Sequence, residues 1–517
     1  MKLPGFPRVY YTAFLLRDIE WFNTWSSNGS VCRRRSDRTR NVYCDLRVGS
    51  YKFDQTGTDS FSEEEDLDSF SHVTLPIDDR NFDGMRLTLW RLTDAKFRES
   101  LVDYKNKEAA KVVKGALSDF DSFSKLKPIR SIQHKSPERI NEDRWVRFCK
   151  EISSWMYGLP HISSCWAEFD SSQITKVFVS TEDRIIVQHQ QIFSFSAAMK
   201  KVTKSGTQIE QELVINAASQ DELPSLAEAK ERLLKKHEQL INLSRAKRIH
   251  SYSGPVLLFP EPAGLLFHEA IGHRLEGSSL LSSADGQTFK GHVGRRVLNI
   301  DINVTYNPRL KSFGGVKCIG AYDFDDEGTE SDEAVLIQDG VLKGFLNTRA
   351  KLSDGPHKLN GHARNKKAQR PISRMAVTII EGKNPRTMDQ MKQLLLDEIR
   401  RQKKPFGLIV YETVGGETET GKHDFQAFSG DVSYATLIYP DGHEVPVSGV
   451  DLVGTPLQAL DNIIAIGKEP LLVNDYCGAE SGFIPISTIS PAILLSNLEL
   501  QAKDEGSAPY ILPPPRL

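Results

Sequence analysis

The chain has 517 residues, of which 39% are hydrophobic and 26% are charged, and its formal net charge is −2. This length can support more than one hydrophobic core, so we expect two domains. The near-neutral charge gives no electrostatic reason to expect a nucleic-acid partner. No apolar run reaches the roughly 20 residues that a membrane-spanning helix needs. The sequence therefore predicts a cytoplasmic protein that binds neither nucleic acid nor membrane.

The first half of the chain is predicted to mix strands and helices. The apolar stretch at 9–16 stops at charged residues without a cleavage site, which favours a strand over a signal peptide. Alternation at 42–53 predicts another strand. Two runs, 174–179 and 184–195, flank turn residues and predict a hairpin. Helices are predicted near 93–115, 137–157 and 224–246.

The second half is predicted to be mostly β. From about residue 250 the chain has many short apolar runs that Gly and Pro separate. The dipeptides Asp339-Gly340 and Asp441-Gly442 each lie between such runs, which is a strong hairpin signal. Helices are expected only at 268–276, about 387–402 and 455–466. We place a domain boundary near residue 247, which gives domains 1–247 and 248–517.

The segment GLLFHEAIGHRLEG at 264–277 contains His268, Glu269 and His273, an H-E-x-x-x-H pattern. The better known H-E-x-x-H places two histidines on one helix face and uses the Glu as general base. A spacing of five turns a regular helix by about 500°, so the two rings would stand roughly 140° apart. A π-type bulge near Gly272 would bring both to one face. Otherwise the two histidines are unrelated.

Cys477 is the one cysteine whose neighbourhood suggests a function. The six cysteines form no C-x-x-C pair, so they do not indicate a disulfide framework. Cys477 lies in the Gly-rich segment NDYCGAESGF after an apolar run. A catalytic zinc usually has three protein ligands, and a thiolate suits zinc well. A buried structural cysteine is the alternative reading of the same segment.

These segments resemble the TldD/PmbA metallopeptidases, in particular the TldD-like members that keep the metal motif. FHEAIGHRLEG at 267–277 is similar to the signature helix of that family. Further similarities follow in order along 250–500: DDEGT within 324–346, NGHARNKKAQRPISRMAV at 360–377, DLVGTPLQALDNI at 451–463, and the Cys-Gly pair at 477–478 with the chain end after it. The first half matches poorly, and it has an insert near 54–90.

The resemblance implies a zinc site formed by His268, His273 and Cys477, with Glu269 as the catalytic carboxylate. It also implies an α+β fold: an N-terminal α/β domain that contributes to the peptide cleft and to the dimer, then a mostly antiparallel β domain that carries the metal-site helix. The implied partner is an identical chain or a TldD/PmbA-type paralogue. Glu276, three residues after His273, is either an outer partner of the site or an ordinary surface residue.

We therefore expect a zinc peptidase that acts on peptides or unfolded proteins, with Glu269 as general base. Two other functions stay open. One is a zinc hydrolase that cuts a non-peptide amide. The other is a non-catalytic subunit that only binds peptides, although such family members lack the motif that this chain keeps.

Overall fold

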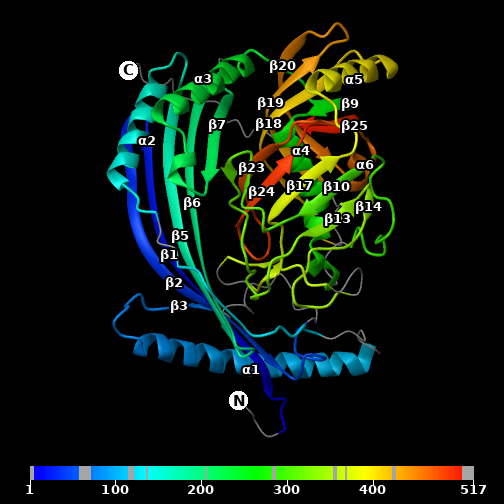
Figure 1. Ribbon diagram of the computed structural model, residues 1–517. Helices are drawn as coiled ribbons and strands as arrows, with labels where there is room; N and C mark the ends of the chain where they lie inside the picture. The colour runs from blue at the N-terminus through cyan, green and yellow to red at the C-terminus, as the bar shows by residue number, and fades with distance from the viewer. Residues whose placement is uncertain are drawn as a thin grey trace.

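The computed structural model describes residues 5–56, 72–114, 122–134, 138–203, 206–281, 287–352, 358–366, 370–421 and 427–503. Its helices and strands are mixed, and most of the described regular structure is sheet. None of the described helices is long and apolar enough to cross a membrane. The fold has two halves that stand side by side, with the long blue-to-green strands in one and the yellow-to-red strands in the other (Figure 1).

The first half is built on one sheet of long strands. The strand order is β3-β2-β1-β5-β6-β4, and β7 also pairs with β6. A two-residue turn joins β1 to β2: Asn28 and Gly29 both have positive φ, as a type I′ turn requires. The strands are β1 Val9–Ser27, β2 Ser30–Val48, β3 His72–Thr74, β4 Ile129–Ile132, β5 Ser164–Ser180, β6 Arg184–Val202 and β7 Gln208–Ala217.

This sheet corrects one expectation. Every pair in it is antiparallel except β4 with β6. The N-terminal half is therefore α+β and not α/β in the strict sense, because its strands join mostly through hairpins and not through the helical crossovers that parallel pairing needs. The predicted hairpin around 180–183 is present as β5 and β6, and both strands extend further than the sequence indicated.

Three helices cover one face of this sheet: α1 Asp83–Lys114, α2 Glu142–Tyr157 and α3 Leu226–Leu243. The side chain of Asn141 caps α2, and Ser225 with Glu228 forms a capping box on α3, which explains where both helices begin. On the opposite face, Tyr11, Ala13 and Leu15 of β1 form a cluster with Phe324 from the second half of the chain. The sheet thus packs its other face on the second half.

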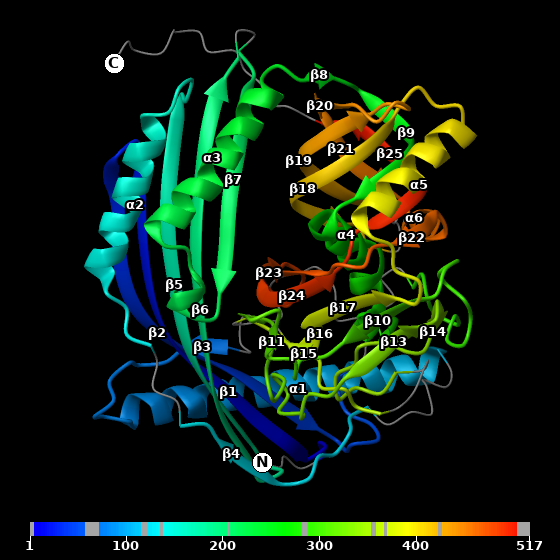
Figure 2. The same ribbon diagram turned by 45° about the horizontal axis from the view of Figure 1, so that its top comes forward.

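The second half contains two main sheets (Figure 2). One has the order β14-β13-β10-β17-β24-β23; the other has the order β18-β9-β25-β21-β19-β20-β8, with β22 beside β25. An added pairing of β18 with β19 closes five strands of the second sheet into a ring. The hairpins predicted at Asp339-Gly340 and Asp441-Gly442 join β13 to β14 and β19 to β20.

Its strands are β8 Lys247–Arg248, β9 Ser251–Leu258, β10 Ile302–Tyr306, β11 Ser312–Phe313, β12 Val316–Lys317, β13 Ala334–Gln338, β14 Val341–Leu342, β15 Ala363–Arg364, β16 Ile372–Ser373, β17 Val377–Gly382, β18 Gly407–Thr418, β19 Phe428–Ile438, β20 Glu444–Ser448, β21 Val450–Gly454, β22 Ile463–Ile466, β23 Leu471–Cys477, β24 Ile484–Ser490 and β25 Ile493–Ala502. The helices are α4 Pro260–Phe267, α5 Met388–Arg401 and α6 Pro456–Asp461. The helix expected at 455–466 is therefore shorter, because its apolar end pairs with β25 as β22.

Buried polar contacts hold the two halves together. Arg349 forms an ion pair with Glu182 at 2.7 Å, and Arg17 forms one with Asp326 at 3.2 Å. All four side chains are at least 97% buried. Removing one partner of such a pair leaves an uncompensated buried charge, which is strongly destabilising. These buried pairs therefore stabilise the contact between the two halves. The proposed division after residue 247 falls inside β8, which already pairs with β20.

Candidate metal centre

The H-E-x-x-x-H segment continues α4 and changes its winding at His268. Residues His268–Gly272 form a π-helix, in which the backbone N–H of His273 donates to the carbonyl of His268. This i→i+5 bond closes one turn with five residues, so His273 stands above His268 on one side of the helix. The two imidazole rings lie 4.9 Å apart between centroids, at 89° to each other. The structure thus takes the first of the two conformations that the spacing allowed.

Gly272 lies against Met375 where this turn packs. A Cβ at this position would lie 2.1 Å from the sulfur of Met375, so any other residue here would require the Met375 side chain to shift. The guanidinium of Arg274 donates to the backbone carbonyl of Glu269 at 2.6 Å and to the hydroxyl of Thr418 at 2.7 Å. The turn is therefore held against β18 as well as against β17.

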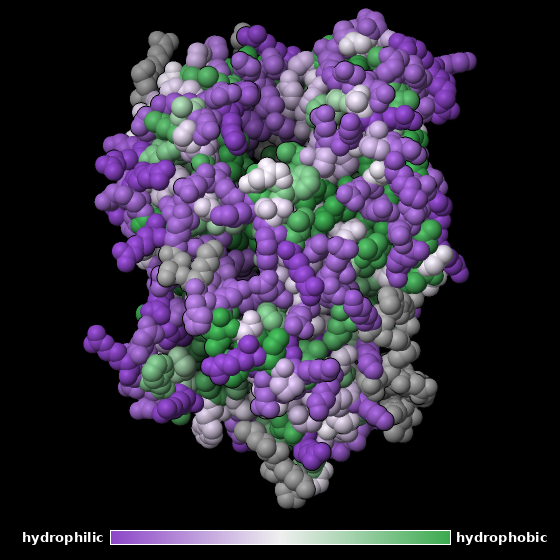
Figure 3. Space-filling model, in the orientation of Figure 1, coloured by the Kyte–Doolittle hydropathy of each residue, from purple (hydrophilic) through white to green (hydrophobic). Residues whose placement is uncertain are grey.

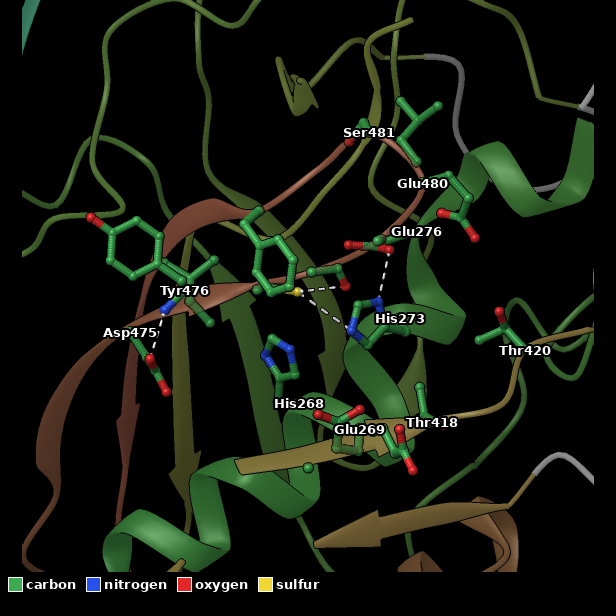
Figure 4. A pocket seen from close by; sticks show the side chains of 18 of the residues that line it. His268, Glu269, His273, Glu276, Thr418, Thr420, Asp475, Tyr476, Glu480 and Ser481 are labelled. Carbon is green, nitrogen blue, oxygen red and sulfur yellow. Dashed lines mark hydrogen bonds and ion pairs between the residues drawn. The ribbon is translucent and has the colours of Figure 1, made fainter. Parts of the chain in front are cut away.

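Cys477 meets the two histidines from the end of β23. Its Sγ lies 3.4 Å from Nε2 of His273, although the two residues are 204 positions apart in sequence. One ligand atom from each of His268, His273 and Cys477 lies within 4.8 Å of the other two. Two donors on one tetrahedral zinc stand about 3.5 Å apart. Two imidazole nitrogens and one sulfur are thus a donor set and a spacing that fit zinc (Figure 4).

The charges of the cysteine and histidine side chains stabilise one another. Burial alone would raise the pKa of the Cys477 thiol, but the imidazoles of His268 and His273 lower this pKa well below its usual value. Burial lowers the pKa of His273, but Cys477 and Glu276 raise it well above its usual value. The thiolate, the form that binds metals, is therefore favoured at Cys477, while a protonated histidine must release its proton before a metal binds.

Glu276 lies behind His273 and orients its ring. The Glu276 carboxylate is 3.1 Å from Nδ1 of His273 (Figure 4). A carboxylate here accepts the Nδ1 proton and leaves the Nε2 lone pair directed at the position where the donors converge. The sequence left two interpretations of Glu276 open, and in the structure its side chain contacts His273 and does not lie on the surface.

Glu269 places a carboxylate next to the three donors. Its side chain is 4% exposed, and its Oε2 atom has no hydrogen-bond partner within the described part of the chain. Burial raises the pKa of this carboxyl above its usual value, while His268 and His273 lower it. A Cβ at Gly416 of β18 would lie 3.3 Å from Cγ of Glu269, so this glycine leaves room for the side chain. A buried acceptor without a partner is an expensive feature that a catalytic role explains.

The site opens into a cleft between the two halves, with a volume of about 1520 Å³. Its walls come from α1, β2, β7 and α3 on one side and from α4, β18 and β23 on the other. The space-filling view shows the surface hollowed between the two halves (Figure 3). A substrate in this cleft would therefore touch both halves of the chain.

The low pKa of Cys477 predicts selective alkylation of the metal-free protein. We expect iodoacetamide to modify Cys477 at pH 6 to 7, because its thiolate persists below the pH at which an ordinary thiol ionises. Burial raises the pKa of Cys44 to about 12 and that of Cys318 to about 11, so both should stay unmodified. Mass spectrometry after chelator treatment measures the sites, and added zinc should protect Cys477. Modification of Cys477 only above about pH 8.5 would contradict the assignment.

Sequence reasoning missed Arg374. Its side chain is fully buried, and Nη2 donates to Sγ of Cys477 at 3.2 Å. The residue lies within the stretch RPISRM, but its partner is 103 residues away in sequence. No local pattern indicates such a contact.

The fold has two halves and is mostly β. Its cleft holds a histidine–histidine–cysteine donor cluster beside a buried carboxylate. This arrangement defines a candidate metallohydrolase. Residues 251–502 match the PmbA/TldA metallopeptidase C-terminal domain. Residues 251–502 thus carry the C-terminal domain of the TldD/PmbA family.

Several curated relatives are named metalloproteases. One from Archaeoglobus fulgidus is 33% identical over 45% of this chain and 49% of its own length. One from Methanocaldococcus jannaschii is 30% identical over 49% of this chain and 52% of its own length. A protein of Saccharolobus solfataricus named zinc metalloprotease TldD homolog is 24% identical over 70% of this chain and 76% of its own. The chain spans about half the length of the first two relatives.

Solved structures show the same fold over nearly the whole chain. TldE from Thermococcus kodakarensis superposes with a TM-score of 0.63 at 12% identity and covers 95% of this chain and 97% of its own. A Thermotoga maritima protein described as a modulator of DNA gyrase gives 0.62 at 14% identity, with 95% and 96% covered. The fold therefore extends through the first half, where the sequence match is weak.

Proposed function

We propose that this chain is a zinc-dependent peptidase that hydrolyses peptides or unfolded proteins. His268, His273 and Cys477 hold the zinc, and Glu269 is the general base. The observation that carries this proposal is the meeting of three metal donors, from two distant segments, beside a buried carboxylate oxygen that lacks a partner. The name of the Saccharolobus relative supports zinc as the metal.

When bound, zinc supplies a lowered pKa for a water molecule and polarises the scissile carbonyl. Glu269 takes the proton of the attacking water at Oε2 and delivers it to the leaving amine. The raised pKa of Glu269 brings the carboxyl nearer to the pH at which it works, so that both transfers are favourable. Glu276 keeps the ring of His273 in the orientation that presents Nε2 to the site.

The cleft favours a chain in extended form as substrate. Its walls include the end of β18 and the strand β7. Among the described residues β7 pairs only with β6, so no strand occupies its other edge, where an extended substrate can pair. Because Glu269 is buried at the bottom of this cleft, we propose that an unfolded segment reaches it more easily than a folded domain. We extend the proposal accordingly to peptides and unfolded proteins and not to folded ones.

The chain is proposed to consist of two domains, 1–247 and 248–517, and to work as a dimer. The first domain contributes walls of the peptide cleft and part of the dimer contact, and the second carries the metal centre. The partner is an identical chain or a TldD/PmbA-type paralogue. Support comes from the fold shared with TldE of Thermococcus kodakarensis. Two chains of the same fold can present equivalent surfaces, which allows a homodimer or a heterodimer.

Two other functions compete with this one. A zinc hydrolase of a non-peptide amide would use the same donors and base, and only the substrate distinguishes it. A non-catalytic peptide-binding subunit needs neither donors nor base. The carboxylate of Glu269 costs free energy to bury without a partner, and a subunit that only binds peptides would have no use for it.

Hydrolysis of a substrate panel tests the proposal. The panel contains an unfolded protein, its folded form, short peptides and a non-peptide amide. We expect hydrolysis of the unfolded protein and the peptides, loss of activity with a chelator, and recovery on addition of zinc. Cleavage of the amide alone would support the second function. Peptide binding with no cleavage of any substrate, with zinc loaded, would support the third.

A further inference from the structure

Arg374 is a buried charged residue whose two terminal nitrogens both donate hydrogen bonds. It follows β16 and is 0% exposed. Nη1 donates to Oγ of Ser481 at 2.9 Å and to the carbonyl of Gly482 at 3.0 Å. Nη2 donates to the carbonyl of Cys477 at 2.8 Å and to its Sγ at 3.2 Å. The planar guanidinium thus holds the ends of the 477–482 loop and the sulfur at once.

The other edge of the same guanidinium contacts Glu276, the residue that orients His273. Nε of Arg374 forms an ion pair with Oε1 of Glu276 at 3.4 Å. Oε1 also accepts the backbone N–H of Met375 at 3.1 Å, and Oε2 contacts Nδ1 of His273. His273 in turn contacts Sγ of Cys477 through Nε2. Arg374, Glu276, His273 and Cys477 therefore form a closed ring of contacts.

The backbone next to Arg374 also contacts this ring. The backbone N–H of Met375, the next residue, donates to Oε1 of Glu276, and the Met375 side chain packs against Gly272 of the π-helix. Arg374 is thus joined to the helix through its own side chain and through its neighbour.

We propose that Arg374 is a positioning residue of the metal centre, which fixes Cys477 directly and His273 through Glu276. This inference rests on the proposed function, since it assumes that these two side chains are ligands. Outer partners of metal ligands typically change metal affinity by 10- to 100-fold when they are removed. Lysine cannot replace Arg374, because one ammonium group cannot reach both Glu276 and the sulfur in a fixed plane.

Cobalt(II) binding to the full chain tests this role without any measurement of activity. The variants are Arg374→Lys, Glu276→Gln and, as matched control, Ser481→Ala, which removes one contact of Arg374 but none to a donor. We expect Arg374→Lys to weaken cobalt binding by about 10- to 100-fold and to shift the sulfur-to-cobalt charge-transfer band at saturation. The control should keep the affinity and the band of the unmodified chain.

Glu276→Gln provides the sharper test, and it remains available if the lysine variant fails to fold. Glu276 touches His273 and Arg374 but has no contact of its own with the sulfur. A shift of the sulfur-to-cobalt band in this variant therefore reports a change passed on through Arg374 or through His273, and a matching shift in Arg374→Lys assigns it to the ring of contacts. An unchanged band and affinity in both variants would overturn the proposal. Absence of the band from the unmodified chain would instead overturn the ligand set, and with it the proposed function.

Discussion

Changing Glu269 to Gln should lower peptidase activity by at least the roughly 100-fold that the loss of a general base typically causes. Glutamine keeps the size of the side chain but cannot accept a proton at the position of Oε2, which is the buried atom without a partner. Bound zinc should stay near one per chain, because the three donors do not include this residue. Activity and zinc content are measured on the same preparation.

The matched control is Glu261→Gln. Glu261 lies on the same helix and lines the same cleft, and its carboxylate accepts the backbone N–H of Thr413. This variant should keep most of its activity. Full activity in the Glu269 variant would assign the base to another residue. Loss of zinc together with activity would show that Glu269 supports the metal, which leaves its role in proton transfer unsupported.

Changing Cys477 to Ser should remove both activity and tightly bound zinc. Serine has nearly the same shape, but its hydroxyl is a poor ligand in place of a thiolate. We expect zinc affinity to fall by more than the 10- to 100-fold that is typical of losing an outer partner of a ligand. Zinc retained after dialysis against a competing chelator, measured by elemental analysis, decides this.

Cys318→Ser is the control for Cys477→Ser. Cys318 is 5% exposed, close to the 3% of Cys477, and it packs with Val377 and Ile489 away from the donors. Its variant should bind zinc as the unmodified chain does. Circular dichroism should show the same fold for both variants. A Cys477 variant that retains a full complement of zinc would mean that a different side chain is the third ligand.

The sequence alone determined features that depend on neighbours in the chain. The Asp339-Gly340 turn is one example: both residues have positive φ, which few other dipeptides tolerate, and the hairpin forms where the pattern predicted it. The helix expected at 224–246 is another: it runs from Leu226 to Leu243, and the capping box of Ser225 and Glu228 explains where it begins. Such features are local because short-range sterics and hydrogen bonds decide them.

The spacing of His268 and His273 is an intermediate case. It limited the segment to two conformations, and the family resemblance favoured the one in which both rings share a face. In the π-helix that forms, Gly272 packs against Met375, a residue about 100 positions away in sequence. The spacing could state the alternatives, but such distant contacts are not visible in it.

Only the tertiary structure decided which distant residues meet. The run at 463–466 was expected to continue a helix, and its pairing with β25 makes it a strand. Arg374 reaches Cys477 and Glu276 because β17 and β24 are neighbours in one sheet, and strand order leaves no local mark in the sequence. The burial of whole faces selects these pairings, and that free energy is summed over many residues far apart in the chain.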